Sequence, residues 1–153
     1  MKIIKYIQKI KYLYMIFILF IINCFLEKII LLNCHKNTKK IINPFLNIQQ
    51  IKNYGFIFGF FEEKIKEKKV FFYSINIIFS ILIILLIYLL FKINKRNKLN
   101  YIFLISGALG NLYDRLKYGY VIDFIDCHYK MYHLPIFNIS DINIFFSLLL
   151  LII

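Results

Sequence analysis

The residues of this chain that could do chemistry are its four aspartates, Asp114, Asp123, Asp126 and Asp141, which all lie near its C-terminal end. Two carboxyl groups held close together cannot both ionise easily, so one of them keeps a proton that the pair shares. The ionised carboxylate can then draw a proton from water while the protonated one polarises a scissile carbonyl group. Hydrolysis by such a pair requires two aspartates from separate segments on one surface, and Asp123 and Asp141 supply them.

The other two aspartates fit structural positions better. Asp114 is followed directly by Arg115, and we expect it to form a structural ion pair or to be a partner at a helix end. Asp126 comes three residues after Asp123, so the two would share one face of a helix if this segment is helical. We expect Asp126 to be a solvated surface residue.

A metal site is the competing interpretation of the residues around Asp126. Cys127, His128 and His133 are potential ligands, but their spacing matches no standard zinc pattern. Histidine together with tyrosine is also ordinary near lipid headgroups. We therefore expect neither a metal ion nor any other cofactor.

The elements that must position the aspartates are apolar helices. The chain has 153 residues, 61% of them hydrophobic, and a mean hydropathy of +0.69. A helix needs about 20 mostly apolar residues to cross a bilayer. The apolar runs predict an all-α integral membrane protein with a single membrane domain over residues 1–153. We expect its four spans at about 12–32, 70–91, 100–114 and 139–153.

Basic residues set the orientation that we expect. The net charge is +12, but the lysines lie between the spans and not in a separate soluble domain, so nucleic acid is not the expected partner. Basic clusters before the first span and between the second and third predict a cytoplasmic loop at 92–99 and outer loops at 33–69 and 115–138. The aspartates then gather at the outer membrane surface, where a functional site is the default hypothesis for a carboxylate.

Four ordered motifs resemble those of a known family. They read "NYGFIFG" from Asn53, "GALGNLYDR" from Gly107, "VIDF" from Val121 and "FNISD" from Phe137. Their order and spacing are similar to those of the lipoprotein signal peptidases, four-span aspartic endopeptidases of the bacterial membrane. The resemblance runs from the first span nearly to the end of the chain.

The resemblance implies a site and a substrate. It places the catalytic pair on Asp123 and Asp141, and it implies a small β platform outside the membrane, between spans one and two. Pocket support would come from Asn53, Gly55, Asn111, Asp114, Arg115 and Asn138. The implied substrates are diacylglyceryl-modified prolipoproteins, cut just before the lipidated cysteine. We expect a monomer in the bacterial inner membrane, in contact with membrane lipid, with its active site at the outer face.

The chain also departs from the family pattern. The family's first-span motif, Asp-Gln-x-x-Lys, falls on "CFLEK", where only Lys28 agrees and Glu27 can partly replace the lost acid. This departure leaves open a decayed member that folds but no longer cuts. A small proton- or cation-conducting transport subunit is the other alternative, although such chains place their acids at mid-membrane depth.

Overall fold

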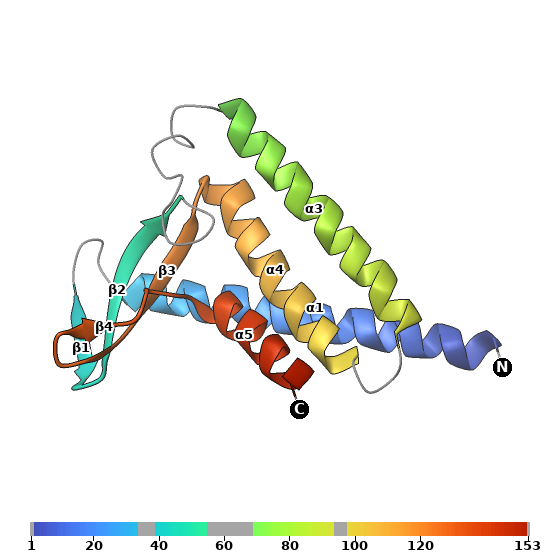
Figure 1. The fold of residues 1–153 in the computed structure, drawn as a ribbon, viewed down its shortest axis with the longest axis horizontal. Helices are drawn as coiled ribbons and strands as arrows, with labels where there is room; N and C mark the ends of the chain where they lie inside the picture. The colour runs from blue at the N-terminus through green and yellow to red at the C-terminus, as the bar shows by residue number, and fades with distance from the viewer. Residues whose placement is uncertain (1, 34–38, 55–68, 94–97, 153) are drawn as a thin grey trace.

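The chain folds into a helical part and a small sheet at one end of it (Figure 1). The computed structural model describes residues 2–33, 39–54, 69–93 and 98–152. Within these ranges the helices are α1 (Lys2–Asn33), α3 (Lys69–Lys92), α4 (Lys98–Tyr118) and α5 (Ile139–Ile152). The strands are β1 (Lys40–Asn43), β2 (Leu46–Asn53), β3 (Val121–Tyr129) and β4 (Tyr132–His133).

The four helices overlap the four predicted spans, although α1 begins at Lys2 and not at residue 12. Two of the helices are long and apolar enough to cross a membrane. These are the segments Tyr6–Asn33 of α1 and Phe72–Lys92 of α3, with mean hydropathies of 2.5 and 2.8. Helix α5 is apolar but shorter, and α4 is diluted by polar residues and glycines. That α4 and α5 also cross the membrane stays a prediction.

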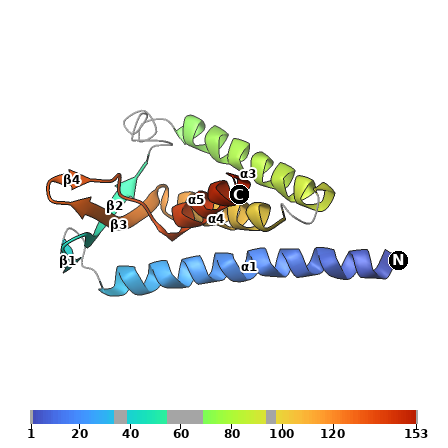
Figure 2. The same ribbon diagram turned by 60° about the horizontal axis from the view of Figure 1, so that its bottom comes forward.

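Helix α4 lies between α1 and α3 (Figure 2). The buried apolar side chains Ile102, Ile105 and Leu112 of α4 form one core with residues of α1 and α3, including Ile16 and Leu90. Many of the large apolar side chains of α1 and α3 point away from this core and are exposed. Such a surface suits lipid, because an apolar solvent carries no penalty for exposed apolar side chains.

Two glycines bring α5 against α4. A Cβ atom at Gly110 would overlap the Ser140 hydroxyl oxygen. One at Gly107 would overlap the Ser140 carbonyl oxygen and lie 2.8 Å from Cγ1 of Ile144. Small residues allow two helix backbones to approach closely in this way. The N-terminal turn of α5 is therefore held beside the C-terminal half of α4.

The sheet takes its strands from both predicted outer loops. It is antiparallel, with the order β1-β2-β3-β4, and β2 pairs with β3 in a register that places Asn47 opposite Asp126 and Asn53 opposite Val121. The prediction of a platform between spans one and two alone was therefore incomplete. The β-branched and aromatic run from Val121 favours a strand, which pairing with β2 stabilises.

A glycine makes the turn from α4 into β3. Helix α4 continues to Tyr118, four residues beyond the predicted span. Gly119 follows with a φ of 82°, a left-handed conformation that glycine adopts without strain, and its N–H donates to the Arg115 carbonyl oxygen at 3.0 Å. The chain thus reverses at the end of α4 and enters β3 only two residues before Asp123.

Candidate active site

Asp123 occupies a buried position in β3 and is held by two side-chain amides. The residue is 3% exposed. Asn53, at the end of β2, donates from Nδ2 to Oδ2 at 2.8 Å. Asn138, just before α5, donates from Nδ2 to Oδ1 at 2.9 Å. Both carboxylate oxygens of Asp123 are therefore fixed by groups from other elements.

Asp141 lies in the first turn of α5 and takes part in the cap of that helix. Its backbone N–H donates to Oδ1 of Asn138 at 3.0 Å, and the backbone N–H of Asn138 donates to Oδ2 of Asp141 at 3.2 Å. This reciprocal pair is a capping box, formed here by asparagine and aspartate. The same hydrogen bonds that cap the start of α5 therefore fix the orientation of the Asp141 carboxylate.

Two asparagines join the two aspartates. Asn111, on α4, donates from Nδ2 to Oδ1 of Asp141 at 2.8 Å. Asn138 donates from Nδ2 to Oδ1 of Asn111 at 3.2 Å, in addition to its bond with Asp123. The contact of α4 with α5 at Gly107 and Gly110 makes this link possible, because it places Asn111, the residue after Gly110, beside the start of α5. Asp123 and Asp141 thus belong to one hydrogen-bond network.

The electrostatic environment favours a proton on Asp123. Burial raises the pKa of Asp123 to about 6, and the nearby charge of Asp141 acts in the same direction. The hydrogen bonds from Asn53 and Asn138 oppose this rise only in part. A carboxyl group in such a place can hold a proton at a pH at which an ordinary aspartate is fully ionised.

Arg115 provides the positive charge close to the aspartates. It interacts electrostatically with Asp141, Asp123 and Asp114. Its Nη1 donates to the backbone oxygen of Asn111 at 3.3 Å, and its guanidinium lies 4.9 Å from the centre of the Phe79 ring. The guanidinium therefore lies between α3 and the network and partly compensates its negative charge.

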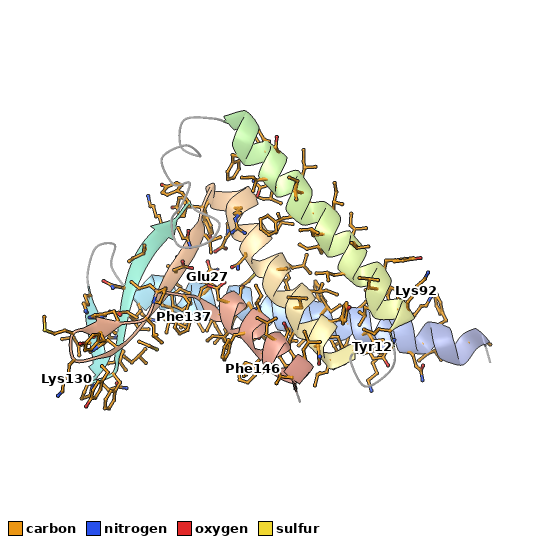
Figure 3. All side chains as sticks on the ribbon, in the orientation of Figure 1. Tyr12, Glu27, Lys92, Lys130, Phe137 and Phe146 are labelled. Carbon is orange, nitrogen blue, oxygen red and sulfur yellow. The ribbon has the colours of Figure 1, made fainter. Side chains whose placement is uncertain are left out.

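An apolar cavity of about 450 Å³ opens beside Asp141. It is lined by Leu134, Phe137, Ile142 and Phe145 together with Asp141. Figure 3 labels Phe137 at the connection that leads from the sheet into α5. No sequence pattern distinguishes the four apolar lining residues, because a chain that is 61% hydrophobic contains many like them. The cavity can hold an extended apolar segment next to a carboxyl group.

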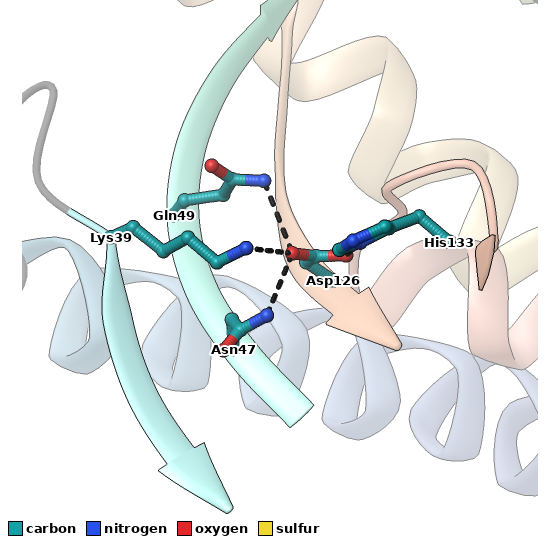
Figure 4. Close-up of polar contacts among 5 residues, drawn as sticks. All are labelled: Lys39, Asn47, Gln49, Asp126 and His133. Atoms are coloured by element: carbon teal, nitrogen blue, oxygen red, sulfur yellow. Dashed lines mark hydrogen bonds and ion pairs between the residues drawn. The ribbon is translucent and has the colours of Figure 1, made fainter. Parts of the chain in front are cut away.

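The prediction that Asp126 is solvated was wrong. Its carboxylate is fully buried and accepts hydrogen bonds from Asn47 at 3.0 Å and Gln49 at 3.3 Å (Figure 4). Lys39 Nζ lies 3.3 Å from Oδ2, and His133 Nδ1 lies 2.6 Å from Oδ1. Because the segment is a strand and not a helix, Asp123 and Asp126 point to opposite faces of the sheet. Asp126 thus anchors the sheet outside the network of Asp123.

The charge of Asp126 is stabilised by these partners. Burial alone would raise the pKa of this carboxyl group, but the bonds from His133, Asn47 and Lys39 outweigh it and lower the pKa to about 2. His133 also stacks on His128, with ring centres 4.9 Å apart. In the part of the chain that the structure describes, no group of three or more His, Cys, Asp or Glu side chains is arranged to hold a metal ion.

Asp114 and Gly55 are the remaining predicted site residues. Asp114 is buried near the end of α4, where its Oδ2 accepts a hydrogen bond from the backbone N–H of Ile122 at 3.1 Å. Its position next to β3 agrees with the expected partner at a helix end. Gly55 lies outside the described residues.

Comparisons with known proteins agree on one family. A family model described as signal peptidase (SPase) II matches residues 15–153. The lipoprotein signal peptidase of Alteromonas mediterranea is 40% identical over 110 residues, which make up 72% of this chain and 60% of that protein. The lipoprotein signal peptidase of Buchnera aphidicola is 36% identical over 141 residues, which make up 92% of this chain and 90% of that protein.

Solved structures show the same similarity. Two structures of a bacterial membrane enzyme, obtained by the in meso method, are each 31% identical to this chain and cover 93% of it. The matches cover 85% and 90% of those chains, with TM-scores of 0.74 and 0.73. Sequence motifs, family model and fold therefore point the same way, and the chain belongs to the signal peptidase II family.

Proposed function

We propose that this chain removes the signal peptide from prolipoproteins, as its family membership implies, and that Asp123 and Asp141 carry out the hydrolysis. The observation that carries the assignment is the network in which Asn138 and Asn111 join the two carboxyl groups. The two aspartates come from different elements, a strand and a helix, and share one set of amide donors. This arrangement suits a pair that acts as a unit.

In the proposed mechanism each carboxyl group has its own role. Asp123 holds the shared proton, since burial raises its pKa, and donates a hydrogen bond to the scissile carbonyl oxygen. Asp141 lies at the apolar cavity and takes a proton from the water that attacks the carbonyl carbon. Arg115 limits the repulsion between the two groups, because its charge is close to both.

The cavity beside Asp141 suits an apolar substrate. Leu134, Phe137, Ile142 and Phe145 offer no charged group to an extended peptide or to an acyl chain. A diacylglyceryl-modified prolipoprotein presents both, so the cleavage site just before the lipidated cysteine would lie next to the carboxyl pair. Binding of such a substrate would also exclude water from the site, which strengthens the electrostatic interactions within it.

We extend the proposal to the place of the protein in the cell. The helices alternate in direction, with the ends of α1 and α4 and the starts of α3 and α5 towards the sheet (Figure 1). This alternation supports four spans in one membrane domain, with residues 92–99 as a cytoplasmic loop. The sheet and the carboxyl pair would then lie at the outer face of the bacterial inner membrane, in a monomer surrounded by lipid.

The test is cleavage of a diacylglyceryl prolipoprotein by the purified protein in detergent. The change in gel mobility of the substrate measures the cleavage. We expect Asp123→Asn and Asp141→Asn each to lower kcat by about 10²–10⁴-fold. The double variant should lose little more, because the two groups act as a unit. Ser147→Ala, a buried change on α5 outside the network, is the matched control and should cleave like the parent.

Folding must be measured alongside cleavage. Asp141 belongs to the cap of α5, so its substitution can also lower stability. Thermal unfolding in the same detergent separates the two effects, since rates are compared only for folded protein. If both single variants and the double variant cleave at the parent rate while folded, Asp123 and Asp141 are not the catalytic pair.

A further inference from the structure

Asp114 has one carboxylate oxygen that lacks a conventional donor. The residue is 2% exposed and lies in the last turns of α4. Its Oδ2 accepts the hydrogen bond from the backbone N–H of Ile122. Its Oδ1 is buried, and no amide, hydroxyl or cationic group of the described residues donates to it. A buried acceptor in this state is costly and calls for a partner.

Glu27 of α1 is the neighbouring side chain that could supply one. Its carboxyl group is hydrogen-bonded to the carboxyl group of Asp114. Two carboxyl groups can form such a bond only when one of them carries a proton, because a carboxylate is an acceptor only. Figure 3 labels Glu27 near the end of α1 that lies towards the sheet. Glu27 is also the acid of the "CFLEK" segment, in which the chain departs from the family motif.

Two cations lie close to the pair. Arg115 and Lys117 act on Asp114 through their charges, and Lys117 also acts on Glu27. The Lys117 ammonium group lies over the rings of Tyr113 and Tyr118, at 5.1 Å and 4.7 Å from their centres. Neither cation donates to Asp114 Oδ1. Among the described side chains close to Asp114, a protonated Glu27 is therefore the group that can still donate to it.

A backbone hydrogen bond links Asp114 to the candidate active site. Ile122 directly precedes Asp123, and its N–H is the group that Asp114 holds. The bond lies just after the turn at Gly119, where the chain leaves α4 for β3. A shift of Asp114 would therefore shift the start of β3, and Asp123 with it. The path runs from α1 through Glu27 and Asp114 to the backbone beside Asp123.

We propose that Glu27 is a positioning residue: its carboxyl group donates a hydrogen bond to Asp114, which fixes the start of β3 and so the place of Asp123. The catalytic part of this inference rests on the proposed function, whereas the structural part does not. Glu27 lies three residues after Cys24, on the same face of α1, and both line one cavity between α1 and α4. Cys24→Ala is therefore a matched control.

The decisive comparison is between Glu27→Gln and Glu27→Leu. Glutamine keeps an N–H group that can donate to Asp114, whereas leucine keeps only the approximate volume. We expect Glu27→Gln and Cys24→Ala to retain the parent kcat within about threefold. Glu27→Leu should lower kcat by about tenfold or more with little change in KM, because a small misplacement of a catalytic group can cost about 100-fold.

A second measurement does not depend on cleavage. In the Asp123→Asn background, hydrogen exchange of the segment that contains Ile122 should be faster by about tenfold in Glu27→Leu, and unchanged in Glu27→Gln. If the leucine variant does not fold, Glu27→Ala takes its place. In Asp114→Asn, a further change of Glu27 to leucine should have little additional effect, since the two residues act through one path.

The outcomes separate this inference from the proposed function. If the parent does not cleave prolipoprotein but Glu27→Leu accelerates exchange at Ile122, the function fails and the positioning role stands. If exchange in Glu27→Leu equals that of the parent, the inference is wrong, whatever the cleavage rate. If Glu27→Gln is as impaired as Glu27→Leu, donation to Asp114 is not what Glu27 supplies, and the inference is equally wrong.

Discussion

Asp126→Asn removes a buried negative charge from the β-sheet and leaves its four partners without it. In the parent, Asn47, Gln49, Lys39 and His133 all direct a nitrogen atom at this carboxylate, at distances of 2.6–3.3 Å. An asparagine at the same place has one acceptor oxygen and an NH₂ group that would face donors. We therefore expect the substitution to destabilise the pairing of β2 with β3.

The magnitude follows from the pKa of Asp126. The pKa is about 2 instead of the ordinary 3.8, and a pKa change of one corresponds to about 1.4 kcal/mol. Net of the cost of burial, the partners thus stabilise the carboxylate by roughly 2 kcal/mol. The side chains of Lys39 and His133 are 44% and 42% exposed, and water screens their part of the interaction. After this discount we expect a loss of about 1–2 kcal/mol in the free energy of unfolding.

Thermal unfolding in detergent, followed by circular dichroism, measures this loss. For a chain of this size, about 1–2 kcal/mol corresponds to a decrease in Tm of roughly 2–8 °C at pH 7. Because the folded-state pKa is lowered, the contribution of Asp126 is complete above about pH 4 and is lost as the pH falls towards 2. The difference between parent and variant should therefore disappear near pH 2.

Two neighbouring lysines at the start of β1 provide a matched comparison. Lys39→Gln removes a partner of Asp126 and should lower Tm, although by less than Asp126→Asn. Lys40→Gln removes the neighbouring exposed charge on β1 and should leave Tm unchanged. If Asp126→Asn unfolds at the parent temperature at pH 7, the buried carboxylate does not anchor the sheet and the reasoning is refuted.

Three further predictions concern helix packing, pH and topology. Gly110→Ala should lower yield and Tm, by about 1–3 kcal/mol of stability, because the new methyl group would overlap the Ser140 hydroxyl oxygen; Ser140→Ala should restore part of the loss, and a stable single variant would contradict the packing. The value of kcat/KM should decline as the pH rises through about 6, where Asp123 loses the shared proton. Because the folded-state pKa is raised, the free energy of unfolding should also decrease as the pH rises from about 4 to 6. A profile of kcat/KM that is flat from pH 5 to 8 would contradict a role of Asp123 in the proton transfer. A topology reporter fused after Lys95 should be cytoplasmic and one after Thr38 external; the reverse result would place the carboxyl pair at the inner surface.

The amino-acid sequence by itself determined where the helices lie and which residues make up the candidate site. Apolar runs mark all four helices, because burial in lipid or in a helix core depends on local composition. Most helix ends lie within a few residues of the prediction, whereas α1 begins at Lys2, well before its apolar run. The motifs identified Asn53, Asn111, Asn138, Asp123 and Asp141, which the structure joins in one network. The proposed chemistry depends on these residue types and their spacing, and both can be read along the chain.

The tertiary structure alone decided what surrounds each carboxyl group. Asp126 is buried because β2 pairs with its strand and brings Asn47 beside it, and Lys39 adds an ion pair from just before β1. No local pattern predicts which distant segment supplies such partners. The same holds for Glu27, whose bond with Asp114 depends on how α1 packs against α4. Burial, hydrogen bonding and pKa are properties of contacts between distant segments, so they exist only once the chain has folded.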